Sequence, residues 1–167
     1  MKYRSFWTPL DRAETPALEW VVRVRRGGWI ERATRVITET GQYGLVWYLI
    51  AAVAAARDEK NRDRWISAAV KVLAIYLINT GIKLVARRRR PELASIGTPT
   101  GLSFPSAHAA TSFAAAQLYG DIVPVARPVL LAGAAGMTST RLHFCVHYPS
   151  DLVAGALLGT ILARLAR

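Results

Sequence analysis

The sequence predicts an all-α protein, a polytopic membrane helix bundle with about five transmembrane helices and an N-terminal amphipathic surface helix. Three observations predict this class. Hydrophobic residues make up 52% of the 167 residues, and they fall in blocks separated by charged or proline- and glycine-containing joints. The blocks are apolar around most of their helical circumference and rich in small residues, as in helices that pack closely within a membrane. The formal net charge is +11, with arginines gathered at the joints.

Two alternatives stay open at this point. Several blocks are shorter than the roughly 20 residues that a clean span needs, so a soluble alanine-rich helical bundle is also compatible with the pattern. The excess of positive charge predicts an anionic partner, and nucleic acid, anionic lipid headgroups and phosphorylated substrates all qualify. The single cysteine, Cys145, excludes an intramolecular disulfide and a cysteine-based metal site.

Residues 1–42 differ from the rest and are predicted to form a basic amphipathic N-terminal segment, followed by the bundle in residues 43–167. Thr15–Pro16 is a plausible helix start, and Gly27–Gly28 interrupts the pattern. Apolar residues repeat at helical spacing on both sides of this break: Leu18, Val21, Val22, Trp29, Ala33, Val36 and Ile37. Arginines lie among them: Arg23, Arg25, Arg26, Arg32 and Arg35. This pattern predicts a helix pair on a membrane surface, with a solvated helix on a soluble core as the alternative.

Five apolar blocks then predict five helices. Residues 43–56 carry no charge and end at the polar run 57–64. Residues 65–86 match the width of a bilayer if Lys71 snorkels or faces protein. The remaining blocks are residues 107–120, 129–140 and 151–167. The last of them contains Gly155-x-x-x-Gly159, a pattern that lets membrane helices approach closely.

The first candidate site motif is an arginine run that ends at a proline. Lys83 and Arg90 are seven residues apart, nearly two helical turns, so both side chains are predicted to point the same way and form a cationic wall. Pro91 is predicted to end the helix and make Arg90 its last residue. The arginines between them, Arg87 to Arg89, are interpreted as an anchor for anionic headgroups.

The second motif, Pro105-Ser106-Ala107-His108, begins an apolar helix. A helix N-terminus offers unpaired N–H groups and a partial positive charge, which together favour an anion, and Ser106 adds a hydroxyl. His108 lies in the first turn. Taken alone, Ser106 is better explained as an ordinary helix cap than as an anion ligand.

The third motif contains Arg141, His147 and Asp151. The spacing of four between His147 and Asp151 places the carboxylate near the imidazole in a helix, although Pro149 disturbs a regular helix there. An Asp at Nδ1 would leave Nε2 free as a nucleophile, and Arg141 would hold phosphate oxygens. A metal site would need His108, His143 and His147 to converge with a carboxylate, and it is disfavoured because no His-x-x-x-His on one helix with a Glu between is present.

In order and spacing, the three motifs together resemble the signature of the type-2 phosphatidic acid phosphatase superfamily, which are integral-membrane lipid phosphate phosphatases. Two positions depart from the pattern: Ala107 stands where the family usually has Gly, and Thr140 where it usually has Ser. Among small bacterial members, the chain resembles enzymes of polyprenyl-linked phosphates, including actinobacterial decaprenylphosphoryl-5-phosphoribose phosphatases.

The resemblance implies a role for each motif residue. His147 would attack phosphorus and form a phosphohistidine, Asp151 would orient His147, and His108 would protonate the leaving alkoxide and then activate water. The phosphate oxygens would be bound by the remaining motif groups, which are Lys83, Arg90, Ser106, the Ala107 N–H and Arg141. No metal and no cofactor would be needed, and the implied partners are a lipid phosphate substrate and membrane lipids rather than nucleic acid.

The expected function is hydrolysis of a phosphomonoester or diphosphate of a polyprenyl-linked or glycerolipid substrate in the bacterial inner membrane. With five spans, 14 of the 22 Lys and Arg residues share the face of the motifs, so the positive-inside rule predicts a cytoplasmic active site. Two other functions remain open. One is a non-catalytic basic membrane protein, which predicts that Arg87 to Arg89 matter more than His147; the other is a soluble phosphatase or haloperoxidase of the same superfamily.

Overall fold

The computed structural model of the protein describes residues 6–25 and 27–167. This part of the chain forms seven α-helices and three short 3-10 turns. In chain order the helices are α1 (Thr8–Val24), α2 (Trp29–Thr40), α3 (Leu45–Arg57), α4 (Arg62–Ala86), α5 (Ala107–Ile122), α6 (Arg127–His143) and α7 (Pro149–Leu165). The all-α prediction is confirmed, and the five predicted bundle helices correspond to α3 to α7.

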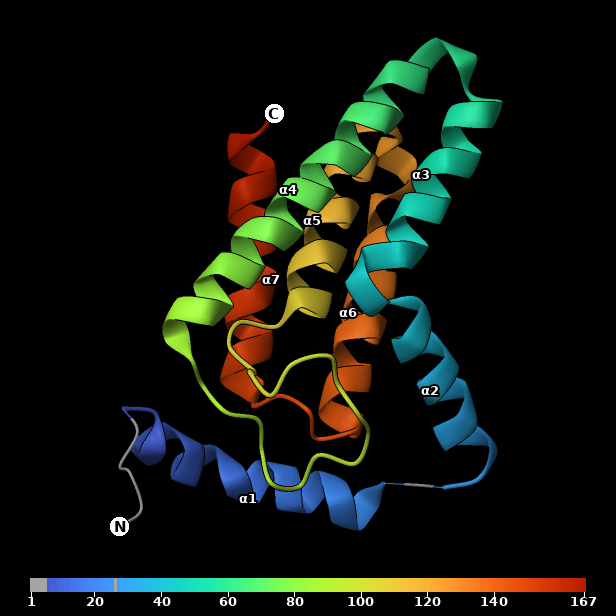
Figure 1. The fold of residues 1–167 in the computed structure, drawn as a ribbon. Coiled ribbons are helices and arrows are strands. Elements are labelled where there is room, and N and C mark those ends of the chain that lie inside the picture. The colour runs from blue at the N-terminus through green and yellow to red at the C-terminus, as the bar shows by residue number, and fades with distance from the viewer. Residues whose placement is uncertain (1–5, 26) are drawn as a thin grey trace.

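Helix α5 is the centre of the bundle, packed against α4, α6 and α7, while α1 runs crosswise beneath one end (Figure 1). Most α5 residues are buried, because alanines and other small residues let the neighbouring helices approach from all sides. The loop between α4 and α5 fills the space between the bundle end and α1 (Figure 1). This end of the molecule is where the three sequence motifs meet.

The predicted close packing at Gly155 and Gly159 is found between α7 and α5. A Cβ at Gly155 would meet the Ser106 carbonyl and lie 3.0 Å from the Ala109 Cβ. A Cβ at Gly159 would collide with the backbone of Ala110. The absence of a side chain at these two positions therefore brings the middle of α7 into direct contact with the N-terminal part of α5.

The helical segment Glu59–Ala86, which includes α4, is long and apolar enough by itself to cross a membrane, alone among the helices of the described residues. The other bundle helices contain 13 to 17 residues. Five independent spans are therefore not demonstrated by length and composition.

The N-terminal segment differs from the prediction in where its first helix begins. Helix α1 begins at Thr8 with Pro9 in its first turn, and Pro16 lies inside the helix. Proline is well accommodated in a first turn, where its missing N–H costs no hydrogen bond, so Pro9 is the better start. The predicted break at Gly27–Gly28 is confirmed, since Gly28 has φ +74° between α1 and α2. Arg26, predicted among the basic residues here, lies outside the described residues.

The end of α4 also differs from the prediction. The helix ends at Ala86, and Arg87 adopts a left-handed conformation with φ 50°. Arg90 is thus a loop residue rather than the last helical residue. Pro91 disfavours the helical conformation only at Arg90. The helix ends earlier, and Arg88 turns away from it toward the carboxylates of Asp11, Glu14 and Asp151.

Candidate active site

A cavity of about 80 Å³ opens at the α1 end of the bundle. Six of the eight predicted site residues line it: Lys83, Arg90, Ala107, His108, Arg141 and His147. Three cations and two histidines thus converge on a space with room for a few heavy atoms, taking about 30 Å³ per water for scale. A larger hollow of about 570 Å³ beside Asp63 and Lys71 contains none of these six residues.

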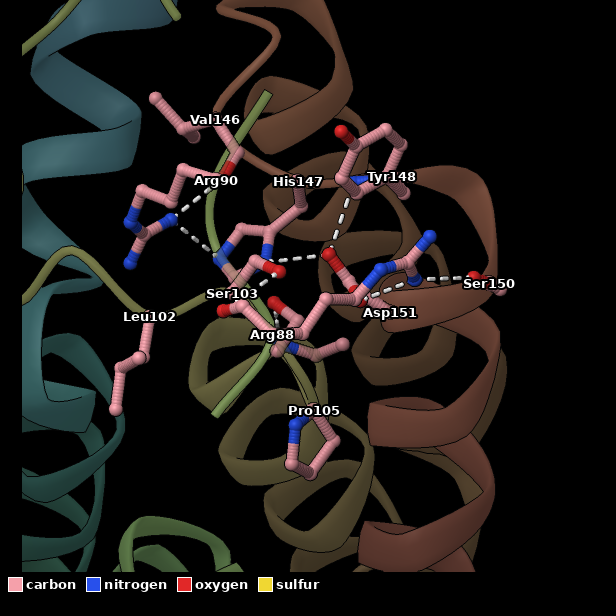
Figure 2. A network of polar contacts seen from close by, with 12 residues as sticks. Arg88, Arg90, Leu102, Ser103, Pro105, Val146, His147, Tyr148, Ser150 and Asp151 are labelled. Carbon is pink, nitrogen blue, oxygen red and sulfur yellow. Dashed lines mark hydrogen bonds and ion pairs between the residues drawn. The ribbon is translucent and has the colours of Figure 1, made fainter. Parts of the chain in front are cut away.

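The geometry around His147 determines which of its nitrogens carries the proton. Arg90 Nη1 lies 3.1 Å from His147 Nε2 (Figure 2). Burial lowers the pKa of Arg90 to about 10, so the guanidinium remains charged at neutral pH and can only donate. Nε2 therefore accepts, and the proton lies on Nδ1, which is 3.5 Å from Asp151 Oδ2.

His147 is neutral at physiological pH. Complete burial of the ring is the main cause that depresses its pKa well below the ordinary value, and the nearby charges of Arg90, Lys83 and Arg141 act in the same direction. A neutral imidazole whose Nε2 carries an electron pair rather than a proton, at the wall of a cavity lined by basic side chains, is suited to nucleophilic attack on an anionic ester once the substrate takes the place of the Arg90 contact.

Pro149 explains why His147 and Asp151 meet although they do not share a helix. Pro149 is the first residue of α7, so His147 precedes the helix and Asp151 lies in its first turn. The Tyr148 N–H donates to Asp151 Oδ2 at 2.9 Å, which caps the helix and orients the carboxylate. Asp151 does not line the cavity and supports His147 from behind.

Lys83 contacts the loop that leads to Ser106. Its ammonium donates to the carbonyls of Ser103 at 2.8 Å and Pro105 at 2.9 Å. These bonds satisfy a side chain that is almost completely buried on α4. Lys83 therefore both lines the cavity and ties the α4–α5 loop to α4.

The second motif lies at the start of α5 as predicted. Ser106 is the N-cap, with its hydroxyl 3.5 Å from the Ala109 N–H, and it does not line the cavity. Ala107 and His108 do line it. His108 Nε2 lies 3.0 Å from the carbonyl of Thr38.

Thr38 of α2 is a site residue that the sequence reasoning missed. It is fully buried, and its Oγ1 accepts a hydrogen bond from Arg141 Nη1 at 2.6 Å. The hydroxyl of Thr140 lies 2.9 Å from the same atom. The surrounding sequence offered no signal, because Thr38 follows two exposed apolar residues and belongs to no motif.

The interpretation of Arg87, Arg88 and Arg89 as three equivalent anchors for anionic headgroups is wrong for Arg88. Arg87 and Arg89 are exposed, whereas Arg88 is completely buried. Its guanidinium donates to Asp151 Oδ1 at 2.7 Å and to Glu14 Oε2 at 2.7 Å. The side chain is drawn inward because three carboxylates, including Asp11, converge on it.

Further cavity residues lie outside the three motifs. They come from the turn after α2, from α4 and from the α4–α5 loop: Gln42, Tyr43, Tyr76, Thr80, Pro99 and Thr100. Only the packing of these elements brings them to one place, so local patterns in the sequence could not identify them.

The three histidines were also considered as metal ligands. Within residues 6–25 and 27–167, no group of three His, Cys, Asp or Glu side chains is arranged to hold a metal ion. His143 lines a separate hollow with Trp20 and Ile30, away from His108 and His147.

The family to which this helix bundle and its cavity belong is identified by comparison with known protein families. A profile of the PAP2 superfamily matches residues 64–167. The chain therefore belongs to the PAP2 superfamily and is a phosphatase of that superfamily.

Named relatives agree with this assignment. The chain is 34% identical over 140 residues to the decaprenylphosphoryl-5-phosphoribose phosphatase of Mycobacterium tuberculosis strain H37Rv. The aligned region covers 81% of this chain and 77% of the relative. The enzyme of the same name from Mycolicibacterium smegmatis is 35% identical over 125 residues, covering 72% and 68%. The crystal structure of a transmembrane PAP2-type phosphatidylglycerolphosphate phosphatase from Bacillus subtilis has the same fold, with a TM-score of 0.77 and 20% identity over 95% of this chain and 84% of that chain.

Proposed function

We propose that this protein is a membrane lipid phosphatase that hydrolyses a phosphomonoester of a polyprenyl-linked lipid through a phosphohistidine on His147. The observation that carries the proposal is the contact between Arg90 and His147 Nε2 at 3.1 Å. It leaves Nε2 without a proton, on a residue that lines the cavity, and it places the proton on Nδ1, which faces Asp151.

The reaction would proceed in two steps. His147 Nε2 forms a bond to phosphorus as the bond to the leaving lipid oxygen breaks, and His108 donates a proton to that oxygen. A water molecule then attacks phosphorus, His108 accepts its proton, and the bond between phosphorus and His147 breaks. The products are the lipid alcohol and inorganic phosphate.

The remaining site groups would stabilise charge during both steps. Lys83, Arg90 and Arg141 would neutralise the phosphoryl oxygens, which needs no metal ion because three cations already surround the cavity. The Ala107 N–H at the start of α5 would add a backbone donor, with Ser106 capping that turn. Asp151 would stabilise the His147 imidazolium that forms after attack.

The substrate class is supported by the relatives and by the cavity. A decaprenyl-linked phosphoribose is the first candidate, because the enzymes about one-third identical to this chain are named for it. Hydroxyls and an amide of Gln42, Tyr76 and Thr100 border the cavity and offer hydrogen bonds to a polar headgroup. Phosphatidylglycerophosphate, phosphatidic acid and undecaprenyl diphosphate are the competing candidates.

A five-span arrangement is supported by the exposed apolar surface of the bundle. On α7, one side exposes an apolar residue every fourth position: Val153, Leu157, Ile161 and Leu165. On α4 the exposed residues include Val70, Leu73 and Leu77. Apolar surface of this extent fits a lipid environment. Residues 1–42 would form a layer on the membrane surface, and residues 43–167 the bundle within it.

The cytoplasmic orientation can be tested with introduced cysteines. Cys145 is a poor probe, since it is buried and burial raises its pKa. In a Cys145→Ala background, Gly97→Cys probes the site end and Lys60→Cys the opposite end; both positions are exposed. We expect a membrane-impermeant maleimide to label Lys60→Cys in intact spheroplasts and Gly97→Cys only after lysis. The reverse pattern refutes the orientation.

The function is tested by phosphate release from the candidate lipids by detergent-purified protein. We expect turnover that EDTA does not reduce, and its loss in His147→Ala together with the acid-labile phosphoenzyme. Arg89→Gln is the control, because Arg89 is exposed outside the cavity. Full activity in His147→Ala contradicts the mechanism. No phosphate release from the wild type, with lipid binding that is lost in Arg89→Gln and kept in His147→Ala, favours a non-catalytic lipid-binding protein.

A further inference from the structure

A buried ionic network connects α1 to the candidate nucleophile through Arg88. The side chain lies between α1 and the start of α7 and is the largest fully buried one among the described residues. It contacts Asp11 at 2.9 Å and Glu14 at 2.7 Å on α1, and Asp151 at 2.7 Å on α7. Asp151 in turn faces His147, and Figure 2 shows Arg88, Asp151 and His147 in contact one after another. Together with the contacts of Arg88 to Asp11 and Glu14, they form a continuous path from α1 to the imidazole.

The position of Arg88 is restricted on every side. Its guanidinium lies 4.0 Å from the ring centroid of Tyr148 and 5.0 Å from that of Trp7. It also donates to Ser150 Oγ at 2.6 Å. Guanidinium groups combine planar hydrogen bonding with stacking on aromatic faces, so lysine could not reproduce this set of contacts.

Glu14 extends the network to the helix that carries Asp151. Its carboxylate accepts from the Ser150 N–H at 2.7 Å and from the Ser150 hydroxyl at 2.8 Å. An acidic side chain at this N-terminus also interacts favourably with the dipole of α7. α1 is thereby joined both to Arg88 and to the turn that presents Asp151.

Asp151 depends on Arg88 for its charge. The carboxylate is completely buried, and Arg88 is its closest cationic partner, bound by a direct hydrogen bond. A buried carboxylate that lacks a cation tends to take up a proton. A protonated Asp151 could neither fix the Nδ1–H tautomer of His147 nor stabilise the imidazolium that follows attack.

We propose that Arg88 is a positioning residue that keeps Asp151 ionised and directed at His147, and that the α1 carboxylates Asp11 and Glu14 hold Arg88 in place. The N-terminal surface helix is then part of the catalytic apparatus. This inference rests on the proposed function, since it assigns Arg88 to the same reaction.

A double-mutant cycle tests this role. Arg88→Gln should lower kcat by roughly 10- to 100-fold with little change in KM, as expected for the loss of a supporting partner. If Arg88 acts through Asp151, the same substitution in an Asp151→Asn background should cost no more than about 2-fold. A merely structural role would instead cost a similar factor in both backgrounds, which would overturn the proposal. Arg87→Gln and Arg89→Gln are matched controls from the same run and should match the wild type, since both side chains are exposed.

The pH profile provides a second readout. In Arg88→Gln, activity should recover as the pH rises and Asp151 ionises again, whereas the controls should keep the wild-type profile. Arg88→Lys retains the charge without the fork and should lie between the wild type and Arg88→Gln. A uniform loss at every pH refutes the positioning role.

A measurement that needs no turnover separates this inference from the proposed function. The chain has three histidines, so ¹⁵N-histidine spectra are simple, and His147→Gln assigns the signal of interest. We expect a single Nδ1–H tautomer for His147 in the wild type and in Arg89→Gln, a mixture of tautomers in Arg88→Gln, and a smaller change in Arg88→Lys, which retains the charge. An unchanged tautomer in Arg88→Lys and in Arg88→Gln refutes the inference even if the protein is a phosphatase. If the wild-type protein releases no phosphate from any of the candidate lipids, the proposed function is refuted, whatever the tautomer of His147.

Discussion

Removing the hydroxyl of Thr38 should impair phosphate binding from a distance. Thr38→Val keeps the shape of the side chain but deletes the acceptor that Arg141 Nη1 contacts at 2.6 Å. Arg141 is only 3% exposed, and its Nε already has no partner among the described residues. The backbone carbonyl of Thr38, which contacts His108, is unaffected by the substitution.

The size of the effect follows from the charge of Arg141. A hydrogen bond to a charged group contributes about 1.5–3 kcal/mol, and each 1.4 kcal/mol corresponds to tenfold. The freed guanidinium would leave its position at the cavity wall, so we expect kcat/KM to fall by roughly 10- to 100-fold. The loss should appear largely in KM if Arg141 binds substrate and transition state alike.

The assay is phosphate release at several lipid phosphate concentrations. Thr34→Val, one turn earlier on α2, is the matched control, because its hydroxyl donates to the Ile30 carbonyl of the same helix at 2.8 Å and to no other group in residues 6–25 and 27–167. We expect the control to retain wild-type kcat/KM. Equal kcat/KM for the two variants would refute the assignment of Thr38 to the site.

Two further predictions concern packing and pH. Gly159→Ala places a methyl group against the Ala110 backbone and should lower the stability of the detergent-solubilised protein by about 1–3 kcal/mol. Gly81→Ala is the control and should not lower it, because a Cβ there meets nothing within 4 Å. Equal unfolding temperatures for the two variants would contradict the packing argument. The pKa of His147 is depressed in the folded protein, so below about pH 6.5 the unfolded chain binds more protons than the folded one. The free energy of unfolding should therefore fall as the pH drops below that value, by up to about 1.4 kcal/mol per pH unit for this group. His147→Gln should flatten this loss between pH 6.5 and 5.5, and an unchanged slope in thermal unfolding would show that His147 is not held neutral.

Local patterns in the sequence were sufficient for the helices of the bundle. Blocks of apolar residues between charged joints predict α3 to α7, because a run without charges has to be buried in protein or lipid. The spacing of Lys83, His108 and His147 within their motifs also identified a common site, since motif order and spacing are properties of the chain alone. All three residues line the cavity.

The same local reasoning was wrong where distant residues decide the conformation. Helical spacing placed Arg90 at the end of a helix, but the chain leaves that helix at Ala86 and approaches the cavity as a loop. For His147 and Asp151, by contrast, the disturbance of a shared helix that was predicted from Pro149 is found, since Pro149 begins α7 between them. Pro149 acts on its own neighbours, whereas α4 ends five residues before Pro91, where Arg88 is drawn to carboxylates of α1 and α7.

The sequence by itself determined the helical class, the order of the bundle helices and the residues of the three motifs, because these depend on composition and on neighbours within a few turns. Only the tertiary structure decided which arginine of the run is buried and which residues of the N-terminal segment join the site. Arg88 differs from Arg87 and Arg89 solely in its partners, and Glu14 and Asp11 lie 74 and 77 residues away in the chain. Thr38 reaches Arg141 across 103 residues. Contacts of this range are decided by how whole helices pack, and no local pattern encodes them.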